Sequence, residues 1–157
     1  ITDKMPQNFL YISLICSTFK NAKIVHVKRN PAATCWGNYK QLFENKKTNN
    51  YSYSLNDVVD YFGLYKKLMQ FWEEQYSNLI YHLDYEMFTM NQEDETIKLI
   101  KYLDLKWENQ CLTPQNNKRF INTASNAQIR QKVYQGSSLQ WKKFESCLNG
   151  IFNDLKN

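Results

Sequence analysis

The stretch KIVHVKRNPAATCWGNYKQLF, residues 23–43, decides the fold class. Its first six residues are rich in β-branched side chains and predict a short buried strand over 23–28. Asn30 and Pro31 then suit the cap and the first position of a helix, in which apolar residues recur at helical spacing up to Phe43. The stretch therefore predicts a strand, a tight turn and a helix.

The same alternation of strand and helix extends in both directions along the chain. Residues 1–3 predict the remnant of a strand, followed by a helix that ends near residue 19, and residues 79–84 predict another strand followed by a helix. Between them, Ser54 and Asp57 resemble a capping box at the start of a long amphipathic helix. Strands that alternate with helices predict an α/β fold with a parallel sheet flanked by helices.

A final helix is predicted after an irregular segment over 106–138, which is rich in Asn, Gln and Ser. Its inward-facing apolar residues would be Trp141, Phe144, Leu148, Ile151 and Leu155. With 157 residues, the chain predicts a single domain over 1–157.

Composition narrows the classes of function. The net charge of +5 suits an anionic ligand, but the basic residues are too few and too scattered to predict nucleic-acid binding. No apolar run is long enough to span a membrane and no signal peptide is recognisable, so we expect a soluble, cytoplasmic protein. The four cysteines lack metal-binding spacing, and we expect them to be reduced and mostly packed.

Polar residues follow each predicted strand at the edge where ligands bind in parallel sheets: Lys4, Arg29 and Tyr85. Arg29 stands directly before a capped helix, and a guanidinium beside free backbone N–H groups favours a phosphate or a sulfate. The helix end contributes about 0.3–1 kcal/mol, whereas a hydrogen bond from arginine contributes about 1.5–3 kcal/mol. On spacing alone, a surface ion pair of Arg29 is an equally good interpretation.

Five stretches in order carry a resemblance to a known family: TDKMPQNF (2–9), KNAKIVHVKRNPAATCWGNYKQLF (20–43), LDYEMF (83–88), WENQCL (107–112) and RFINTASNAQIRQKVYQGSSLQWKKFE (119–145). From Thr2 to about Leu148 the sequence resembles the carboxyl-terminal half of sulfotransferases that use 3′-phosphoadenosine 5′-phosphosulfate (PAPS). It is most similar to bacterial sulfotransferases joined to tetratricopeptide repeats and to tyrosylprotein sulfotransferases. The resemblance implies a partial P-loop-like sulfotransferase fold and transfer of a sulfuryl group from this adenine nucleotide to an acceptor hydroxyl, without a metal.

The resemblance also assigns roles to individual residues. Arg29 would bind the 3′-phosphate of the nucleotide, and Tyr85 would help to hold the nucleotide, although packing of its ring is nearly as good an interpretation. Lys4 would face the sulfuryl group and neutralise charge that develops on the bridging oxygen. The hydroxyl of Ser125 would donate a hydrogen bond in the same region, although Ser125 alone reads as a loop residue.

Two positions depart from the family pattern. Gly37 stands where a serine normally joins the arginine at the 3′-phosphate, and Gln140 stands where a basic residue normally precedes Trp141. By the resemblance, residues 128–143 form a loop over this phosphate. A neighbouring cation would compensate for Gln140: Arg130, Lys132, Lys142 or Lys143.

The glycines stand at 37, 63, 136 and 150, so no Gly-rich loop that would wrap a phosphosulfate is present. By the resemblance, the first strand, this loop and the catalytic base lie on the amino-terminal side of Ile1, so we expect a carboxyl-terminal part of a longer enzyme, inactive alone. His26 and His82 fall in the middle of predicted strands, where side chains are packed or hydrogen-bonded, and neither is nominated as the base.

Two rival functions remain at the level of sequence. One is a degenerate, non-catalytic sulfotransferase-like module that binds a nucleotide or a protein, which Gly37 and Gln140 favour. The other is a basic module that binds RNA, which rests only on the net charge and on the 15% of aromatic residues.

Overall fold

The computed structural model describes residues 1–43, 49–117 and 130–155. Its α-helices are α1 (Ile12–Thr18), α2 (Pro31–Tyr39), α3 (Leu55–Tyr76), α4 (Tyr85–Met90) and α5 (Gln92–Tyr102), and its strands are β1 (Ile24–Lys28) and β2 (Ile80–Asp84). Short 3-10 helices join them: η1 (Pro6–Tyr11), η2 (Asn50–Tyr53), η3 (Ser77–Leu79), η4 (Asn109–Leu112), η5 (Pro114–Asn116) and η6 (Ser137–Cys147). Within these described ranges, no helix combines the length and the apolar character needed to cross a membrane.

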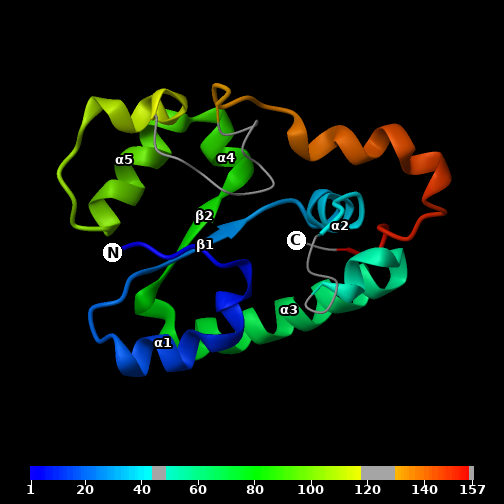
Figure 1. The fold of residues 1–157 in the computed structure, drawn as a ribbon, viewed down its shortest axis with the longest axis horizontal. Helices are drawn as coiled ribbons and strands as arrows, with labels where there is room; N and C mark the ends of the chain where they lie inside the picture. The colour runs from blue at the N-terminus through cyan, green and yellow to red at the C-terminus, as the bar shows by residue number, and fades with distance from the viewer. Residues whose placement is uncertain (44–48, 118–129, 156–157) are drawn as a thin grey trace.

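The strands β1 and β2 pair in parallel, with Ile24 opposite Ile80 and Lys28 opposite Asp84. Helices α1 and α3 lie on one side of this sheet and α4 and α5 on the other (Figure 1). Both strands end at the same edge, where α2 and α4 begin. The predicted α/β class, a parallel sheet flanked by helices, is therefore confirmed.

The connection from β1 to α2 forms as its sequence predicts. The side chain of Asn30 accepts a hydrogen bond from the backbone N–H of Ala33 at 2.9 Å, and Pro31 occupies the first turn. The buried face of α2 includes Ala32, Ala33 and Cys35. This face fixes α2 against the core, so the helix start and the preceding Arg29 have a defined position.

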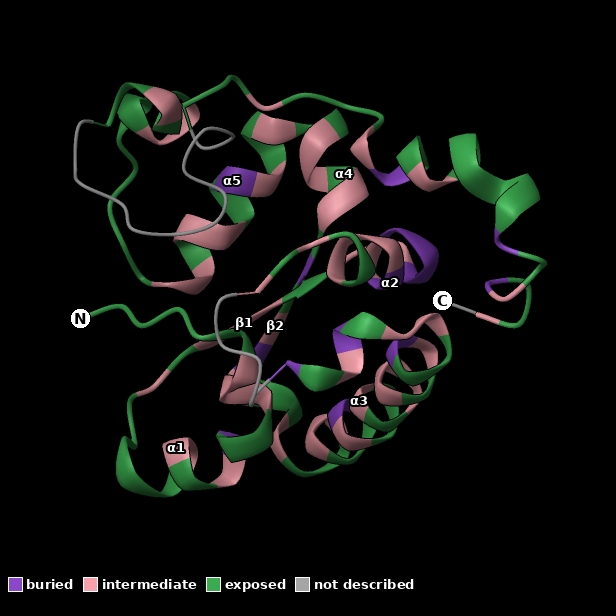
Figure 2. Ribbon diagram, turned by 45° about the vertical axis from the view of Figure 1, so that its right-hand side comes forward, coloured by how far each residue is buried: buried purple, intermediate pink, exposed green. Residues whose placement is uncertain are grey.

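Helix α3 supports two buried clusters. Its start is capped by Ser54, whose hydroxyl accepts from the N–H of Asp57 at 3.3 Å. One cluster joins α2, α3 and the carboxyl-terminal segment: Ala32, Cys35, Val58, Leu148 and Phe152. The other joins α1, α3 and β2: Ile12, Met69 and Ile80. Figure 2 shows buried positions on α2 and α3, which pack together.

The cysteines are free thiols, as predicted. Cys35 is fully buried, and burial raises the pKa of its thiol to about 12. Cys16 and Cys111 are half-buried, whereas Cys147 is exposed. The packed interpretation is therefore correct for three of the four residues.

The predicted strand at residues 1–3 is wrong. Residues 1–5 form no strand, and they are exposed to solvent. A strand persists only where its backbone groups pair with a neighbouring strand, and the sheet of the described residues contains β1 and β2 alone. The helix predicted after this segment is present as η1 followed by α1.

The predicted final helix is also corrected. Residues 137–147 form the 3-10 helix η6, and turns follow over 148–154. Asn149 and Gly150 adopt φ angles of 48° and 73°, which end a right-handed helix. Leu148 and Phe152 still point into the core, but Phe144 is half exposed. The Asn-Gly dipeptide was the sequence signal for this break.

Candidate functional site

Arg29 lies at the carboxyl end of β1, between the strand and the Asn30 cap of α2. Its Nε donates to the hydroxyl of Ser138 at 3.0 Å, and its Nη2 donates to the hydroxyl of Ser137 at 3.2 Å. Its guanidinium carbon lies 4.8 Å from the centre of the Tyr85 ring, within cation–π range. The Tyr85 and Ser137 hydroxyls share a hydrogen bond of 2.8 Å. We call Arg29, Tyr85, Glu86, Ser137 and Ser138 the strand-end cluster.

Glu86 brings a negative charge to this cluster. Its carboxylate accepts from the backbone N–H of Asn30 at 3.2 and 3.3 Å and from the hydroxyl of Ser138. Ser138 therefore bridges the guanidinium and the carboxylate, and it is buried. Because the amino-terminal end of a helix favours negative charge, Glu86 stabilises the start of α2 as a bound anion would.

The structure brings together two of the predicted site residues, Arg29 and Tyr85. Lys4 lies in the exposed segment before η1, and within the described ranges it makes no hydrogen bond or ion pair. Arg130 is exposed at the start of the described segment 130–155. Ser125 lies outside the described residues.

The segment predicted to lie over the 3′-phosphate reaches the cluster through Ser137 and Ser138. These two serines and Glu86 were missed as site residues because their contacts with Arg29 and Asn30 span 56 to 109 positions of sequence. The available signal was Gly136, which precedes the two serines and adopts a φ of 85°. A glycine there marks a sharp turn that presents the following residues to a neighbouring element.

The two positions that depart from the family pattern are both accommodated without strain. Gly37 lies in α2, and a Cβ atom at this position would meet no atom within 4 Å. Gln140 is exposed in η6. Each position therefore has room for the side chain that the pattern contains.

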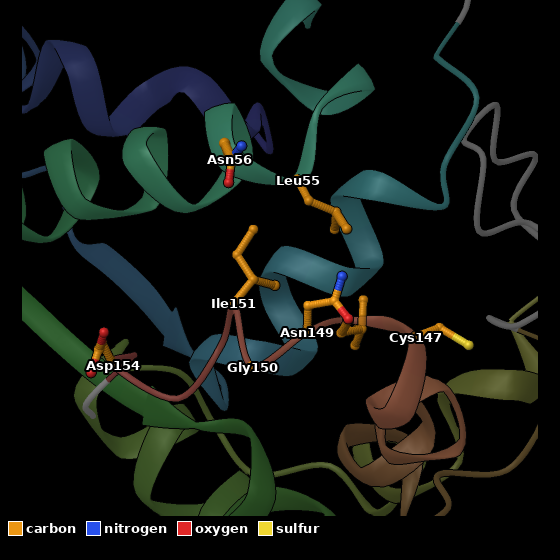
Figure 3. Close-up of a pocket in the computed structure, with 8 residues that line it drawn as sticks. Leu55, Asn56, Cys147, Asn149, Gly150, Ile151 and Asp154 are labelled. Atoms are coloured by element: carbon orange, nitrogen blue, oxygen red, sulfur yellow. The ribbon is translucent and has the colours of Figure 1, made fainter.

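A pocket of about 540 Å³ lies between the start of α3 and the carboxyl-terminal segment (Figure 3). Its lining includes Leu55 and Asn56 on one side and residues 147–151 and Asp154 on the other. None of these residues belongs to the strand-end cluster. The lining has an acidic side chain and no basic one, so this pocket does not favour an anionic ligand.

A second polar cluster lies in the middle of the sheet. His26 and His82 stand opposite each other in the strand pairing, and their Nδ1 atoms are 3.1 Å apart. The prediction that these side chains are packed or hydrogen-bonded within strands is confirmed, since both rings make hydrogen bonds. Burial lowers the pKa of His26 to about 4, with further lowering by His82 and Lys28, and burial also lowers the pKa of His82. Both rings are therefore neutral at pH 7.

Comparison with known proteins adds two findings. A model of the sulfotransferase family matches residues 1–109. A protein of Aquifex aeolicus (strain VF5), named only as an uncharacterized protein, is 32% identical over 157 residues, which cover 99% of this chain and 21% of that protein. The chain thus spans about a fifth of the length of this relative.

Proposed function

Because the chain belongs to the sulfotransferase family, whose members transfer sulfuryl groups, we propose that it binds the 3′-phosphate of PAPS within a PAPS-dependent sulfotransferase. The strand-end cluster carries this proposal. It holds a guanidinium in place between two serine hydroxyls and an aromatic ring, at the carboxyl end of a parallel strand. This edge of an α/β sheet is where ligands bind, and a fixed guanidinium suits a phosphate.

The donors at the cluster suit a phosphate dianion. A guanidinium has five N–H groups, and two of those of Arg29 are directed at Ser137 and Ser138. The other three remain for phosphate oxygens, and the serine hydroxyls add donors that reorient by rotation. The start of α2 contributes its dipole, which favours the same charge.

The transfer step that we propose moves a sulfuryl group in line. The bond between sulfur and the bridging oxygen of PAPS breaks as a new bond forms between sulfur and the acceptor oxygen, and the proton of the acceptor hydroxyl passes to a general base of the complete sulfotransferase. Charge then accumulates on the bridging oxygen of the departing 3′-phosphoadenosine 5′-phosphate (PAP). We assign its stabilisation to Lys4, whose ammonium is exposed and unpaired within the described ranges, and to Ser125. This scheme requires no metal.

The proposal is tested by comparing PAP with adenosine 5′-monophosphate, which differs only in lacking the 3′-phosphate. We expect isothermal titration calorimetry of the chain to give at least about a tenfold lower Kd for PAP, because one charge-assisted contact contributes at least about 1.5 kcal/mol. Equal affinities for the two nucleotides would contradict the assignment of a 3′-phosphate site.

A second candidate function is a non-catalytic module that keeps the fold but binds a nucleotide or a protein. Gly37 favours it because glycine offers no side-chain donor, and Glu86 favours it because its carboxylate already accepts the N–H of Asn30. An assay of sulfuryl transfer from PAPS by the longer protein that contains this chain separates the two. Turnover excludes the second function, and PAP binding without turnover over a panel of sugar, phenol and peptide hydroxyls supports it.

Replacing Gly37 with serine is expected to strengthen PAP binding by about threefold to tenfold. The seven-residue step from Asn30 is nearly two helical turns, so the new side chain starts from the same side of α2 as Asn30, whose N–H meets Glu86. A net hydrogen bond from the new hydroxyl to the phosphate would contribute about 0.5–1.5 kcal/mol. No neighbouring atom obstructs the side chain. Calorimetric titration with PAP measures the change.

Gly37→Ala is the matched control for this gain. Alanine relieves the glycine penalty in α2 by about 1 kcal/mol, at least as much as serine does, without adding a donor. If alanine and serine raise PAP affinity equally, the gain comes from a stiffer helix and the hydroxyl has no contact with the phosphate.

A further inference from the structure

The chain has two histidines, and both lie in one cluster in the middle of the sheet. The parallel register places His26 on β1 directly opposite His82 on β2. Their Nδ1 atoms face each other at 3.1 Å, and the ring centres are 5.2 Å apart. This arrangement is unlike that of two separately packed rings, because it places one nitrogen of each imidazole within hydrogen-bond distance of the other.

The opposite nitrogen of each ring is held by a different side chain of α3. The Nε2 atom of His82 lies 3.3 Å from a carboxylate oxygen of Glu73, and the Nε2 atom of His26 is hydrogen-bonded to the hydroxyl of Tyr65. Imidazoles that bind metals in proteins have this second partner, which orients the ring and selects the tautomer. The outer partners of such a site are therefore already in place.

We propose that His26 and His82 bind a divalent transition-metal ion such as Zn²⁺ through their Nδ1 atoms, with Glu73 beside them. Zinc binds imidazole nitrogen at about 2.0–2.1 Å, and two nitrogens 3.1 Å apart then subtend an angle of about 95–100° at the metal. A rise of a few tenths of an ångström in this separation gives the tetrahedral angle. One ligand atom from each of His26, Glu73 and His82 lies within 4.8 Å of the others, and the carboxylate stands at Nε2 of His82 as the outer partner of that ring.

Metal binding at both Nδ1 atoms requires only that one of the two imidazoles changes its tautomer. In the metal-free chain, one Nδ1–H donates to the other Nδ1. On binding, the proton on that nitrogen moves to the Nε2 of the same ring, and both Nδ1 lone pairs then face the metal. In this state the Nε2–H groups donate to the hydroxyl of Tyr65 and to the carboxylate of Glu73. Water completes the coordination, because the side chains of His82 and Glu73 are each about one-third exposed.

Lys28 limits the affinity of this site. Its ammonium lies 3.2 Å from the same carboxylate oxygen of Glu73 that is near His82, and it adds a positive charge beside the metal. The site therefore combines two neutral imidazoles with a carboxylate whose charge is already shared. We expect binding on the order of micromolar, weaker than that of a closed structural zinc site with four protein ligands.

The bound ion would join β1, β2 and α3, which are far apart in sequence. Its place is the middle of the sheet and not the strand-end cluster, so its role is to stabilise the fold and not to take part in sulfuryl transfer. A ligand that binds only the folded chain raises the melting temperature. At a free Zn²⁺ concentration one hundred times Kd, we expect Tm to rise by about 5–10 °C for a chain of this size.

Nuclear magnetic resonance of the imidazole nitrogens gives the direct test, because the chain has two histidines and both are in the site. On titration with Zn²⁺, both Nδ1 signals should shift to the range of metal-bound nitrogen, while both Nε2 signals keep the shift of a protonated nitrogen. If neither ring responds at about 100 μM free Zn²⁺, or if Nε2 is the nitrogen that binds, the proposal is wrong.

Substitutions distinguish Zn²⁺ binding by the two histidines from Zn²⁺ binding by other side chains of the chain. His82→Gln should weaken Zn²⁺ binding at least about tenfold, and Glu73→Gln, which keeps a hydrogen-bond acceptor, should weaken it about threefold or more. Cys147→Ser is the matched control, because Cys147 is an exposed thiol and its loss should leave the imidazole-bound Zn²⁺ unchanged. If Cys147→Ser abolishes binding while His82→Gln retains it, the ion is held by the thiol and the proposal fails. The ring signals of the unaltered chain decide the question even if His82→Gln unfolds.

Discussion

Replacing Arg29 with alanine is expected to weaken PAP binding by about tenfold to a hundredfold. The guanidinium is the only cation in the strand-end cluster, and a charge-assisted hydrogen bond contributes about 1.5–3 kcal/mol. Affinity for adenosine 5′-monophosphate should change by less than about threefold, because that nucleotide offers no 3′-phosphate to Arg29. The preference for PAP should therefore disappear. Isothermal titration calorimetry with both nucleotides measures this.

Two further substitutions separate the effect of removing a positive charge from the effect of removing the guanidinium of Arg29. Lys20→Ala removes the same charge from an exposed turn and should leave PAP affinity unchanged. Arg29→Lys keeps the charge but loses the planar fork that contacts Ser137 and Ser138. Its affinity for PAP should therefore fall between that of the unaltered chain and that of Arg29→Ala. An unchanged Kd in the Arg29→Ala protein, with its fold intact by circular dichroism, would rule out the proposed 3′-phosphate site.

Replacing Phe152 with alanine is expected to lower the free energy of unfolding by about 3–5 kcal/mol. Phe152 is 5% exposed, lies in the cluster with Cys35 and Val58, and meets the Trp141 ring edge to face at 5.7 Å between centres. Loss of this ring leaves a cavity where the carboxyl-terminal segment packs on α2 and α3. Urea denaturation followed by far-ultraviolet circular dichroism measures the change.

Phe144→Ala is the matched control because it removes the same side chain from the same segment. Phe144 is 47% exposed, and its ring contacts Trp36 at 4.8 Å between centres. The free energy of unfolding should therefore fall by about 1 kcal/mol or less. Similar losses for the two variants would mean that the carboxyl-terminal segment does not pack as described. Because this segment also positions Ser137 and Ser138, Phe152→Ala should weaken PAP binding as well.

The elements predicted correctly from sequence are those whose signals are local. The strand over 24–28 and the start of α2 follow from a β-branched run, an asparagine cap and a proline, all within eight residues. Helix α3 follows from Ser54 and a long apolar periodicity. In each case the residues that determine the element lie inside it or next to it.

The features that were missed depend on contacts between distant segments. Nothing within residues 137–138 indicates that their hydroxyls meet Arg29, because that contact depends on how the carboxyl-terminal segment packs. The pairing of His26 with His82 likewise depends on the register of β1 and β2, since a shift by one residue would turn one ring to the other face. The break in the predicted final helix was missed for a different, local reason, because the Asn149–Gly150 turn was outweighed by the apolar periodicity around it.

The carboxylate of Glu86 gives the strand-end cluster a resident counter-charge. With Arg29 and Glu86 linked through Ser138, one positive and one negative charge cancel. A monovalent anion that replaces the carboxylate would exchange one unit of charge for another and gain little, whereas a phosphate monoester brings a second unit and an additional oxygen. If the cluster binds a phosphate as proposed, we therefore expect it to select anions by their charge, so that chloride and acetate compete poorly with a nucleotide.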